Sequence, residues 1–315
     1  EAVRGGLRGI DARQRDLIQD VVNEGLSPYP VSALEKDLHL SFILERLRSS
    51  QPGLPGLVLC GGTSLVKGHK LIARMSEDMD FKVSVNRNVS KNQRSLLLSG
   101  LKRQIASLLT EDGFVVKKVS AHDQNSFFSI ELGYANAFPL EAALRPHILL
   151  EFTAESPFSP PVVCQATSLL GLAVPEELHS VSFPCLGIEE TIAEKSVAFL
   201  RRSRSGGSQS GEPRDQRLIR HVYDIGSIGA NRVKYPKLEA AFVKALEREA
   251  RKYGLRDLQF QANPKKVLAN AADNLDIAAL RVDYETFVKS LVAGPALSFD
   301  QALQQFNSLV QRLLQ

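Results

Sequence analysis

The chain has 315 residues, of which 43% are hydrophobic and 23% are charged, so it can form one large or two medium globular cores. Its formal net charge of +4 permits a nucleotide or nucleic-acid partner but does not require one. The three cysteines show no CxxC spacing, no apolar run reaches the roughly 18 residues of a membrane span, and no signal-peptide core opens the sequence. These features argue against disulfide-framework, zinc-finger and membrane classes, and they predict a cytoplasmic protein without a membrane partner.

The N-terminal half of the sequence predicts two helices followed by a region of mixed helices and strands. Apolar residues recur at helical spacing in residues 11–24 and 31–49, and Gly and Pro clusters follow both segments. Short apolar or alternating runs predict strands further on, with two helices among them. The strands are expected at 57–60, 80–85, 114–119, 126–132 and 147–152, and the helices at 64–74 and 92–112.

The C-terminal part of the sequence is predicted to be helical almost to its end. Residues 153–187 are rich in Pro and Ser and show no clear period, and the Gly/Ser-rich stretch 203–213 predicts a flexible loop. Helices are expected at 189–203, 214–228, 237–253, 282–292 and 298–314. The pattern therefore predicts an α+β fold in three parts: N-terminal helices in 1–50, a core with a mixed sheet and flanking helices in 51–187, and a helical domain in 188–315.

The stretch SEDMDF, residues 76–81, holds three carboxylates in four positions. If the chain is extended there, the side chains of Asp78 and Asp80 leave the same face and the residues after each of them face the core. Two such carboxylates repel each other unless a cation lies between them, and hard oxygen ligands suit Mg²⁺. Glu151, the only acidic residue of the run HILLEF, is the candidate third ligand of a two-metal site. The residues alone are equally compatible with two turn-capping Asp and a Glu paired with an Arg.

A glycine turn, Gly61-Gly62-Thr63-Ser64, lies between a predicted buried strand and a predicted helix. Glycines let the backbone approach a phosphate closely, a helix N-terminus attracts anions, and the two hydroxyls could donate hydrogen bonds. The spacing is not that of a Walker A loop. A tight turn that binds no ligand is the alternative interpretation.

The region from Lys195 to Arg220 is the most basic part of the sequence. Lys195 lies at the flank of the apolar face of helix 189–203, where it can reach solvent or hold a phosphate. Asp224 can pair with Arg220 one turn earlier in its own helix. A polyanion such as RNA could bind this region, and the candidate contacts are Arg201, Arg202, Arg214, Arg217 and Arg220.

Four stretches in one order resemble a known family. They are LEKDLHLSFILERL (34–47), CGGTSL with SEDMDF (60–81), EETIAEKSVAFLRR (189–202) and PRDQRLIRHVYDI (213–225). Together they resemble the AbiEii-type, MenT-like nucleotidyltransferase toxins of type IV toxin–antitoxin systems, which belong to the DNA polymerase β-like superfamily. The resemblance implies a polymerase β-like nucleotidyltransferase core with a C-terminal helical domain that contributes Lys195 and Asp224 to the cleft.

The resemblance also implies roles for individual residues. Gly61, Gly62 and Thr63, with Ser64 beside them, would hold the triphosphate, and Ser76 would be an active-site hydroxyl. Asp78 and Asp80 would bind Mg²⁺, with two ions expected, and Glu151 would occupy the third carboxylate position. Lys195 would bind a nucleotide phosphate, and Asp224 would be a late acidic residue of the site, supported by Arg220 or His221.

The implied activity is transfer of a nucleotide from an NTP to an RNA acceptor, with the 3′ end of a tRNA as the expected target and a cognate antitoxin as an expected partner. Such a modification would block aminoacylation and therefore translation. Two alternatives stay open at this point. One is a nucleotidyltransferase that acts on a small molecule or a protein hydroxyl, and the other is a non-catalytic module that binds RNA or a partner protein.

Overall fold

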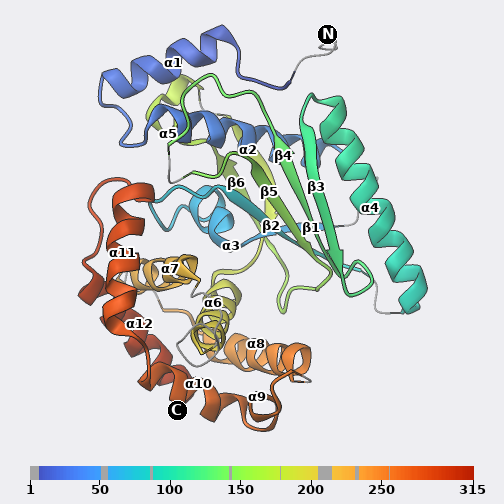
Figure 1. The fold of residues 1–315 in the computed structure, drawn as a ribbon, viewed down its shortest axis with the longest axis vertical. Coiled ribbons are helices and arrows are strands. Elements are labelled where there is room, and N and C mark those ends of the chain that lie inside the picture. The colour runs from blue at the N-terminus through green and yellow to red at the C-terminus, as the bar shows by residue number, and fades with distance from the viewer. Residues whose placement is uncertain are drawn as a thin grey trace. The chain divides into compact units, whose positions relative to one another are not determined.

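The computed structural model describes residues 7–50, 56–85, 88–141, 144–177, 179–204, 215–230, 234–254 and 256–315. The chain forms two compact units (Figure 1). The first unit ends at Leu186. The second runs from Gly187 to Gln315 and includes the short segment Leu71–Ala73. Most of the loop predicted at 203–213, and the candidate contact Arg214, lie outside the described residues.

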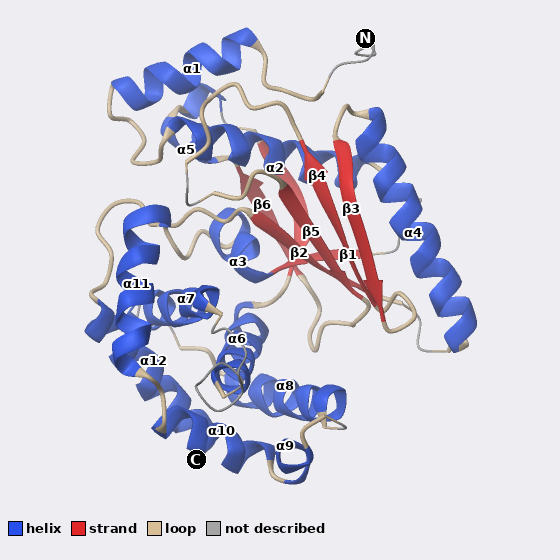
Figure 2. Ribbon diagram, in the orientation of Figure 1, coloured by secondary structure: helices blue, strands red, loops and turns tan. Residues whose placement is uncertain are grey.

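The first unit is built on a seven-stranded mixed sheet with the strand order β3-β4-β5-β2-β1-β7-β6 (Figure 2). Strand β2 pairs with β5 in parallel, β1 pairs with β7 in parallel, and the other pairs are antiparallel. The strands are β1 Leu57–Cys60, β2 Asp78–Val83, β3 Val115–His122, β4 Phe127–Gly133, β5 Ile148–Thr153, β6 Val162–Thr167 and β7 Ser180–Cys185. The sheet and its helices confirm the predicted α+β class.

Four α-helices of more than one turn flank this sheet: α1 Ala12–Asn23, α2 Val31–Ser49, α4 Lys91–Glu111 and the short α5 Leu169–Ala173. Helix α2 packs against α1, α5 and β7, and α4 packs against β3. Capping boxes begin α1 at Asp11 and α4 at Ser90, because each cap side chain accepts the N–H of the third helical residue and that Gln returns a bond.

An aromatic ladder fills one face of the sheet. The rings of Phe81 and Phe152 stack with centroids 5.1 Å apart, and Phe152 stacks on Phe128 at 4.6 Å. These residues lie directly opposite one another in the register of β2, β5 and β4. Since side chains alternate along a strand, the ladder places Asp80 and Glu151 on the other face.

The second unit consists of helices: α6 Ile188–Ser203, α7 Ile219–Ala230, α8 Leu238–Tyr253, α9 Leu258–Ala262, α10 Pro264–Asp273, α11 Ile277–Leu291 and α12 Phe299–Leu314, with a 3₁₀ turn at Gln216–Leu218. Helix α6 packs on α7 and α8, and α7 packs on α12. Gly226 permits the close approach of α7 to α12, because a Cβ there would meet the backbone of Ala302 at 2.9 Å.

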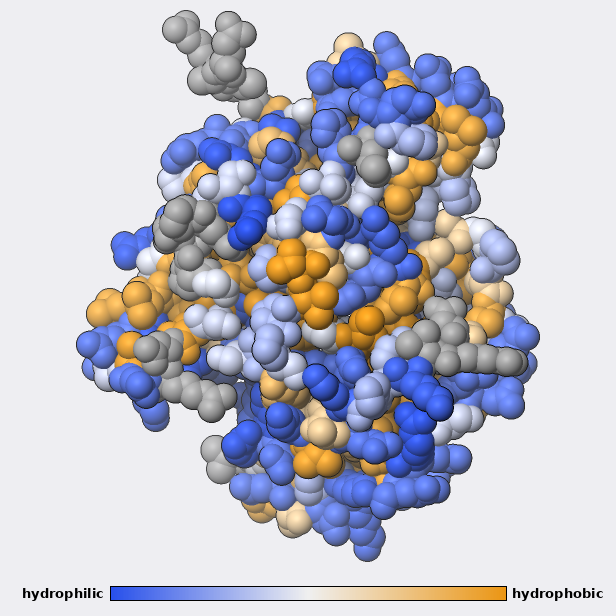
Figure 3. All heavy atoms as spheres, turned by 180° about the vertical axis from the view of Figure 1, so that it is seen from behind, coloured by the Kyte–Doolittle hydropathy of each residue, from blue (hydrophilic) through white to orange (hydrophobic). Residues whose placement is uncertain are grey.

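Hydrophilic and hydrophobic residues are interspersed on the face shown in Figure 3. Several large apolar side chains are exposed singly, among them Leu96 and Val282. Among the described helices, none combines the length and the apolar character needed to cross a membrane.

Most predicted elements are confirmed within a few residues, but some boundaries and elements differ. The helix expected at 64–74 starts earlier, at Gly61, and ends as a π-helix at Gly68. The strand expected at 80–85 begins at Asp78 and ends at Val83, because its pairing with β5 begins at Asp78 and its pairing with β1 ends at Val83. The helix expected at 214–228 is preceded by the 3₁₀ turn, where Asp215 accepts the N–H of Arg217.

The sequence prediction missed several elements. Residues 153–187 form β6, α5 and β7, and residues 258–273 form α9 and α10. Pro184 lies inside β7, where a Pro argues against a strand. Pairing with β6 and β1 therefore makes this segment a strand in spite of its proline.

Candidate active site

Two charged side chains lie close to the glycine turn. Gly61 follows β1 and has φ of +65°, in the left-handed region that favours glycine. A Cβ at Gly61 would overlap the carboxylate of Asp80, and a Cβ at Gly62 would overlap the guanidinium of Arg74. A side chain at either position would therefore have to displace the end of a charged side chain.

The acidic strand lies beside this turn. Asp80 is opposite Cys60 of β1 on one side and opposite Glu151 of β5 on the other. Asp78, two residues earlier, shares the face of Asp80, whereas Met79 is fully buried on the opposite face. The alternation expected from the sequence is confirmed, and Glu151 is the carboxylate that the sheet register places next to Asp80.

Thr63 and Ser76 join the turn to the acidic strand. Their hydroxyl oxygens lie 2.8 Å apart, and the Thr63 hydroxyl also donates to the backbone oxygen of Asp78. Thr63 and Ser64 are both fully buried. The Thr63 hydroxyl is thus bonded inside the unit, and the Ser64 hydroxyl is buried beside it, so neither is exposed for the ligand contact that the sequence suggested.

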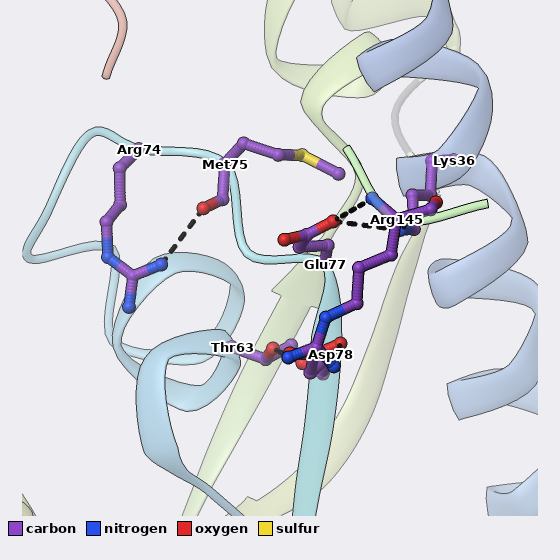
Figure 4. Close-up of polar contacts among 7 residues, drawn as sticks. All are labelled: Lys36, Thr63, Arg74, Met75, Glu77, Asp78 and Arg145. Atoms are coloured by element: carbon purple, nitrogen blue, oxygen red, sulfur yellow. Dashed lines mark hydrogen bonds and ion pairs between the residues drawn. The ribbon is translucent and has the colours of Figure 1, made fainter. Parts of the chain in front are cut away.

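A buried ion pair supports the start of the acidic strand (Figure 4). The Nζ atom of Lys36 lies 3.1 Å from Oε2 of Glu77 and donates to the backbone oxygen of Arg145 at 3.0 Å. The backbone N–H of Arg145 donates to the same Glu77 oxygen at 2.8 Å, and its Nη1 lies 3.0 Å from Oδ1 of Asp78. Burial lowers the pKa of Lys36, and the Glu77 carboxylate opposes that shift.

Helix α2 supplies two more buried charged residues, one on each side of Lys36. Glu35 accepts the backbone N–H groups of Ala137 and Phe138 at 2.6 and 3.2 Å. Asp37 pairs with Lys67 of the π-helix at 2.5 Å and accepts the backbone N–H of Leu169 at 2.7 Å. Three consecutive charged residues therefore hold three separate segments around the glycine turn and the acidic strand.

In the second unit, Lys195 and Asp224 form an ion pair between α6 and α7. Lys195 Nζ lies 2.9 Å from Oδ2 of Asp224 and 3.5 Å from Nδ1 of His221. The Asp224 side chain is fully buried and that of Lys195 is 9% exposed. The partner found for Asp224 is thus a lysine from another helix, in addition to any local contact with Arg220.

Several of the candidate RNA contacts have partners inside the second unit. Arg201 pairs with Glu249 at 2.7 Å and stacks on the ring of Tyr253 at 3.7 Å from the centroid. Arg202 pairs with Asp215, while Arg217 is exposed. The arginines that the sequence predicts as RNA contacts therefore differ in their exposure and in their ion pairs.

Comparison with known proteins decides the family. The family model described as "Nucleotidyl transferase AbiEii toxin, Type IV TA system" matches residues 43–305, which is most of the chain. The chain belongs to the AbiEii family. It is therefore a nucleotidyltransferase toxin of a type IV toxin–antitoxin system, with a nucleoside triphosphate as substrate, a divalent metal as the family's usual cofactor and an antitoxin implied by the system.

A solved structure supports the fold of this AbiEii-family chain. It is similar to MenT4, a nucleotidyltransferase toxin from Mycobacterium tuberculosis H37Rv, with a TM-score of 0.54 and 15% sequence identity. The similarity covers 97% of this chain and 98% of MenT4. No curated protein sequence gives a significant match.

The first unit of this AbiEii-family chain contains carboxylates of the kind that suit a divalent cation. Those of Asp78 and Asp80 leave one face of β2, and the Asp78 carboxylate is partly exposed. Within the described ranges, however, no group of three or more His, Cys, Asp or Glu side chains is gathered as a metal site. Arg145 holds one oxygen of Asp78, which gives a physical reason why the three carboxylates are not drawn together.

Sequence reasoning missed Lys36, Arg74, Glu77 and Arg145 as residues of this site. Lys36 stands in a run of three charged residues within an otherwise apolar helix, LEKDLHL, which is a signal for buried partners. Arg74 and Arg145 carry no comparable pattern. Only the packing of the loops around β2 shows that they face the turn and the acidic strand.

Proposed function

We propose that this AbiEii-family enzyme is Mg²⁺-dependent and transfers a nucleoside monophosphate from an NTP to an RNA acceptor, the 3′ end of a tRNA, and so blocks translation in the cytoplasm. One observation carries the proposal: Asp80 lies against the bare backbone of Gly61, where a Cβ would overlap its carboxylate, and Arg74 lies in the same way against Gly62. A glycine turn lets a triphosphate approach the backbone, and the carboxylates of the neighbouring strand could hold a metal beside it.

The residues would divide the work as follows. The backbone of Gly61, Gly62 and Thr63 would bind the β- and γ-phosphates, with Ser64 behind it. Asp78 and Asp80, with Glu151 in the third position, would hold two Mg²⁺ ions. When bound, Mg²⁺ supplies stabilisation of negative charge on the attacking and leaving oxygens.

Other side chains would orient and bind the substrate. Ser76 is held by its contact with Thr63 and would be an active-site hydroxyl. The Lys195 ammonium would contact a phosphate, and Asp224 would hold that ammonium in place with His221. These roles follow the family resemblance and are supported by the ion pair.

The basic residues between 195 and 220 support an RNA acceptor, because neutralised phosphates dominate the affinity of proteins for nucleic acids. Arg217 is exposed and available for such a contact, and we propose Arg201, Arg202, Arg214 and Arg220 as further contacts. The ion pairs of Arg201 and Arg202 favour a second candidate, in which the acceptor is a small molecule or a protein hydroxyl.

Label transfer tests the proposal. The protein is incubated with each of the four α-³²P-labelled NTPs, Mg²⁺ and total tRNA, and the RNA is resolved and its 3′ ends are sequenced. We expect label at tRNA 3′ ends with the wild type and with Asp112→Asn, a matched charge change remote from β2, and none with Asp80→Asn. Equal labelling by Asp80→Asn, or no labelling of RNA by the wild type, would contradict the proposal.

A further inference from the structure

Arg145 lies in the loop before β5, and its backbone is held on both sides by one buried ion pair. Its N–H donates to Oε2 of Glu77, and its carbonyl oxygen accepts from Nζ of Lys36. The side chains of Lys36 and Glu77 are 0% and 1% exposed. Removing two such charges from water is unfavourable before their attraction is counted, so this pair is weak evidence for stability, and its visible effect is to hold the loop.

The result of this arrangement is the direction of the Arg145 side chain. Its guanidinium reaches Oδ1 of Asp78 at 3.0 Å, and the two side chains are 15% and 19% exposed (Figure 4). Asp78 directly follows Glu77 in the sequence. The same ion pair therefore fixes the backbone of both partners of the Arg145–Asp78 contact.

The Arg145–Asp78 contact lies beside two further carboxylates. Asp78 and Asp80 share one face of β2, and Glu151 lies opposite Asp80 in the neighbouring strand. Like charges at this spacing repel, and the Arg145 guanidinium offsets one of them. A divalent cation that uses Asp78 as a ligand needs the carboxylate to which Arg145 is bonded.

We propose that Arg145 is a positioning residue that competes with the divalent cation for Asp78 and thereby sets how tightly the site binds that cation. The inference rests on the metal site of the proposed function. Without metal, the guanidinium neutralises and orients Asp78. When the cation binds, the Arg145–Asp78 hydrogen bond is exchanged for the bond to the metal, so each binding event includes the loss of that contact.

Binding of Mn²⁺, without nucleotide or RNA, tests the inference. The signal of free Mn²⁺ in electron paramagnetic resonance spectra gives the dissociation constant for the wild type and the variants. Arg145→Met keeps the length of the side chain and removes its charge. We expect it to bind Mn²⁺ about tenfold more tightly, the size expected when one charge-assisted hydrogen bond no longer has to be broken.

A matched control separates local competition from the change in net charge. Arg46→Met removes the same charge from another ion pair of the first unit, with Asp112 at 2.7 Å, and it is expected to leave the Mn²⁺ affinity unchanged. Asp78→Asn is expected to abolish the tight site in both backgrounds. Arg145→Gln serves as a second neutral variant if Arg145→Met does not fold, and Arg145→Lys is expected to stay close to the wild type.

The outcomes are distinct. Unchanged or weaker binding by the neutral Arg145 variants overturns the inference, as does tighter binding by Arg46→Met of the same size. Absence of any Mn²⁺ site that depends on Asp78 overturns it as well. Failure of nucleotidyl transfer to RNA, with tighter Mn²⁺ binding by Arg145→Met, would count against the proposed acceptor and leave the inference standing.

Discussion

Each unit contains a lysine–carboxylate pair in its interior, and the two pairs differ in their access to solvent. Lys36 and Glu77 in the first unit are 0% and 1% exposed, and their hydrogen bonds go to the backbone of Arg145. Lys195 in the second unit is 9% exposed and contacts two side chains, Asp224 and His221. A pair without access to solvent can only position other residues, whereas a lysine with some access to solvent can also bind a phosphate.

The largest expected effect is on stability and comes from the fully buried pair. Lys36→Met leaves the Glu77 carboxylate buried without its counter-ion, which we expect to lower the free energy of unfolding by about 3–5 kcal/mol. Urea unfolding followed by circular dichroism measures this change. If Lys36→Met were as stable as the wild type, the pair would not be the support that its burial indicates.

The second prediction concerns the dependence of stability on pH. His39 is buried against Phe114 and Tyr134, and burial lowers its pKa to about 3. In the unfolded chain His39 has a pKa of about 6.5, so it binds a proton that it does not bind in the folded chain. The contribution of His39 to the free energy of unfolding is therefore fully present above pH 6.5 and decreases as the pH falls. Between pH 6.5 and 5 we expect a slope approaching about 1.4 kcal/mol per pH unit from this residue.

Unfolding curves at several pH values measure that slope, and His39→Phe provides the comparison. The variant keeps an aromatic ring between Phe114 and Tyr134 and removes the titrating group. Its stability is expected to change less over the same pH range. An equal slope in both proteins would show that other groups cause the pH dependence.

The more accessible pair is expected to matter less for folding and more for activity. Lys195→Met should lower the free energy of unfolding by about 1–3 kcal/mol, because Asp224 loses one charged hydrogen bond. Nucleotide transfer should fall far more than this loss of stability explains. The contrast between the two pairs fails if Lys36→Met and Lys195→Met lose stability and activity in the same proportion.

Two glycine variants separate the cost of backbone strain from the cost of a close contact. Gly25 and Gly61 both have positive φ, +69° and +65°, but no atom lies within 4 Å of a Cβ built at Gly25. Gly25→Ala should cost about 1–2 kcal/mol for the left-handed backbone. Gly61→Ala should cost about 1–3 kcal/mol more and reduce activity, because its methyl group overlaps the Asp80 carboxylate.

Thermal unfolding of the two alanine variants measures the difference, and label transfer shows whether only Gly61→Ala affects catalysis. Equal losses would mean that Asp80 moves aside at little cost. In that case the positive φ of Gly61 alone would explain why a glycine stands at this position.

The sequence predicted the parts of the molecule that depend on local pattern. Helices α7, α8 and α12 have strong apolar periods, and Gly113 follows the end of α4 with φ of +89°. The alternation in SEDMDF predicted that Asp78 and Asp80 share one face, because side chains alternate along any strand. The order of four motifs predicted the family.

Long-range packing determined the rest. No local pattern indicates that Lys36 pairs with Glu77, Lys67 with Asp37, or Lys195 with Asp224. Likewise, the strand β7 contains Pro184 and forms only because β6 and β1 pair with it. Such contacts join residues dozens of positions apart, and a single sequence does not show which distant charges meet.

By itself, then, the sequence determined most of the helices and strands, the residue types of the acidic strand and the glycine turn, and the family to which they belong. Only the tertiary structure decided which charges neutralise one another and which side chains lie against the glycine turn. The reason is physical: a period of apolar residues acts within one element, whereas a buried charge needs a partner that only the folded chain brings within 3 Å or so.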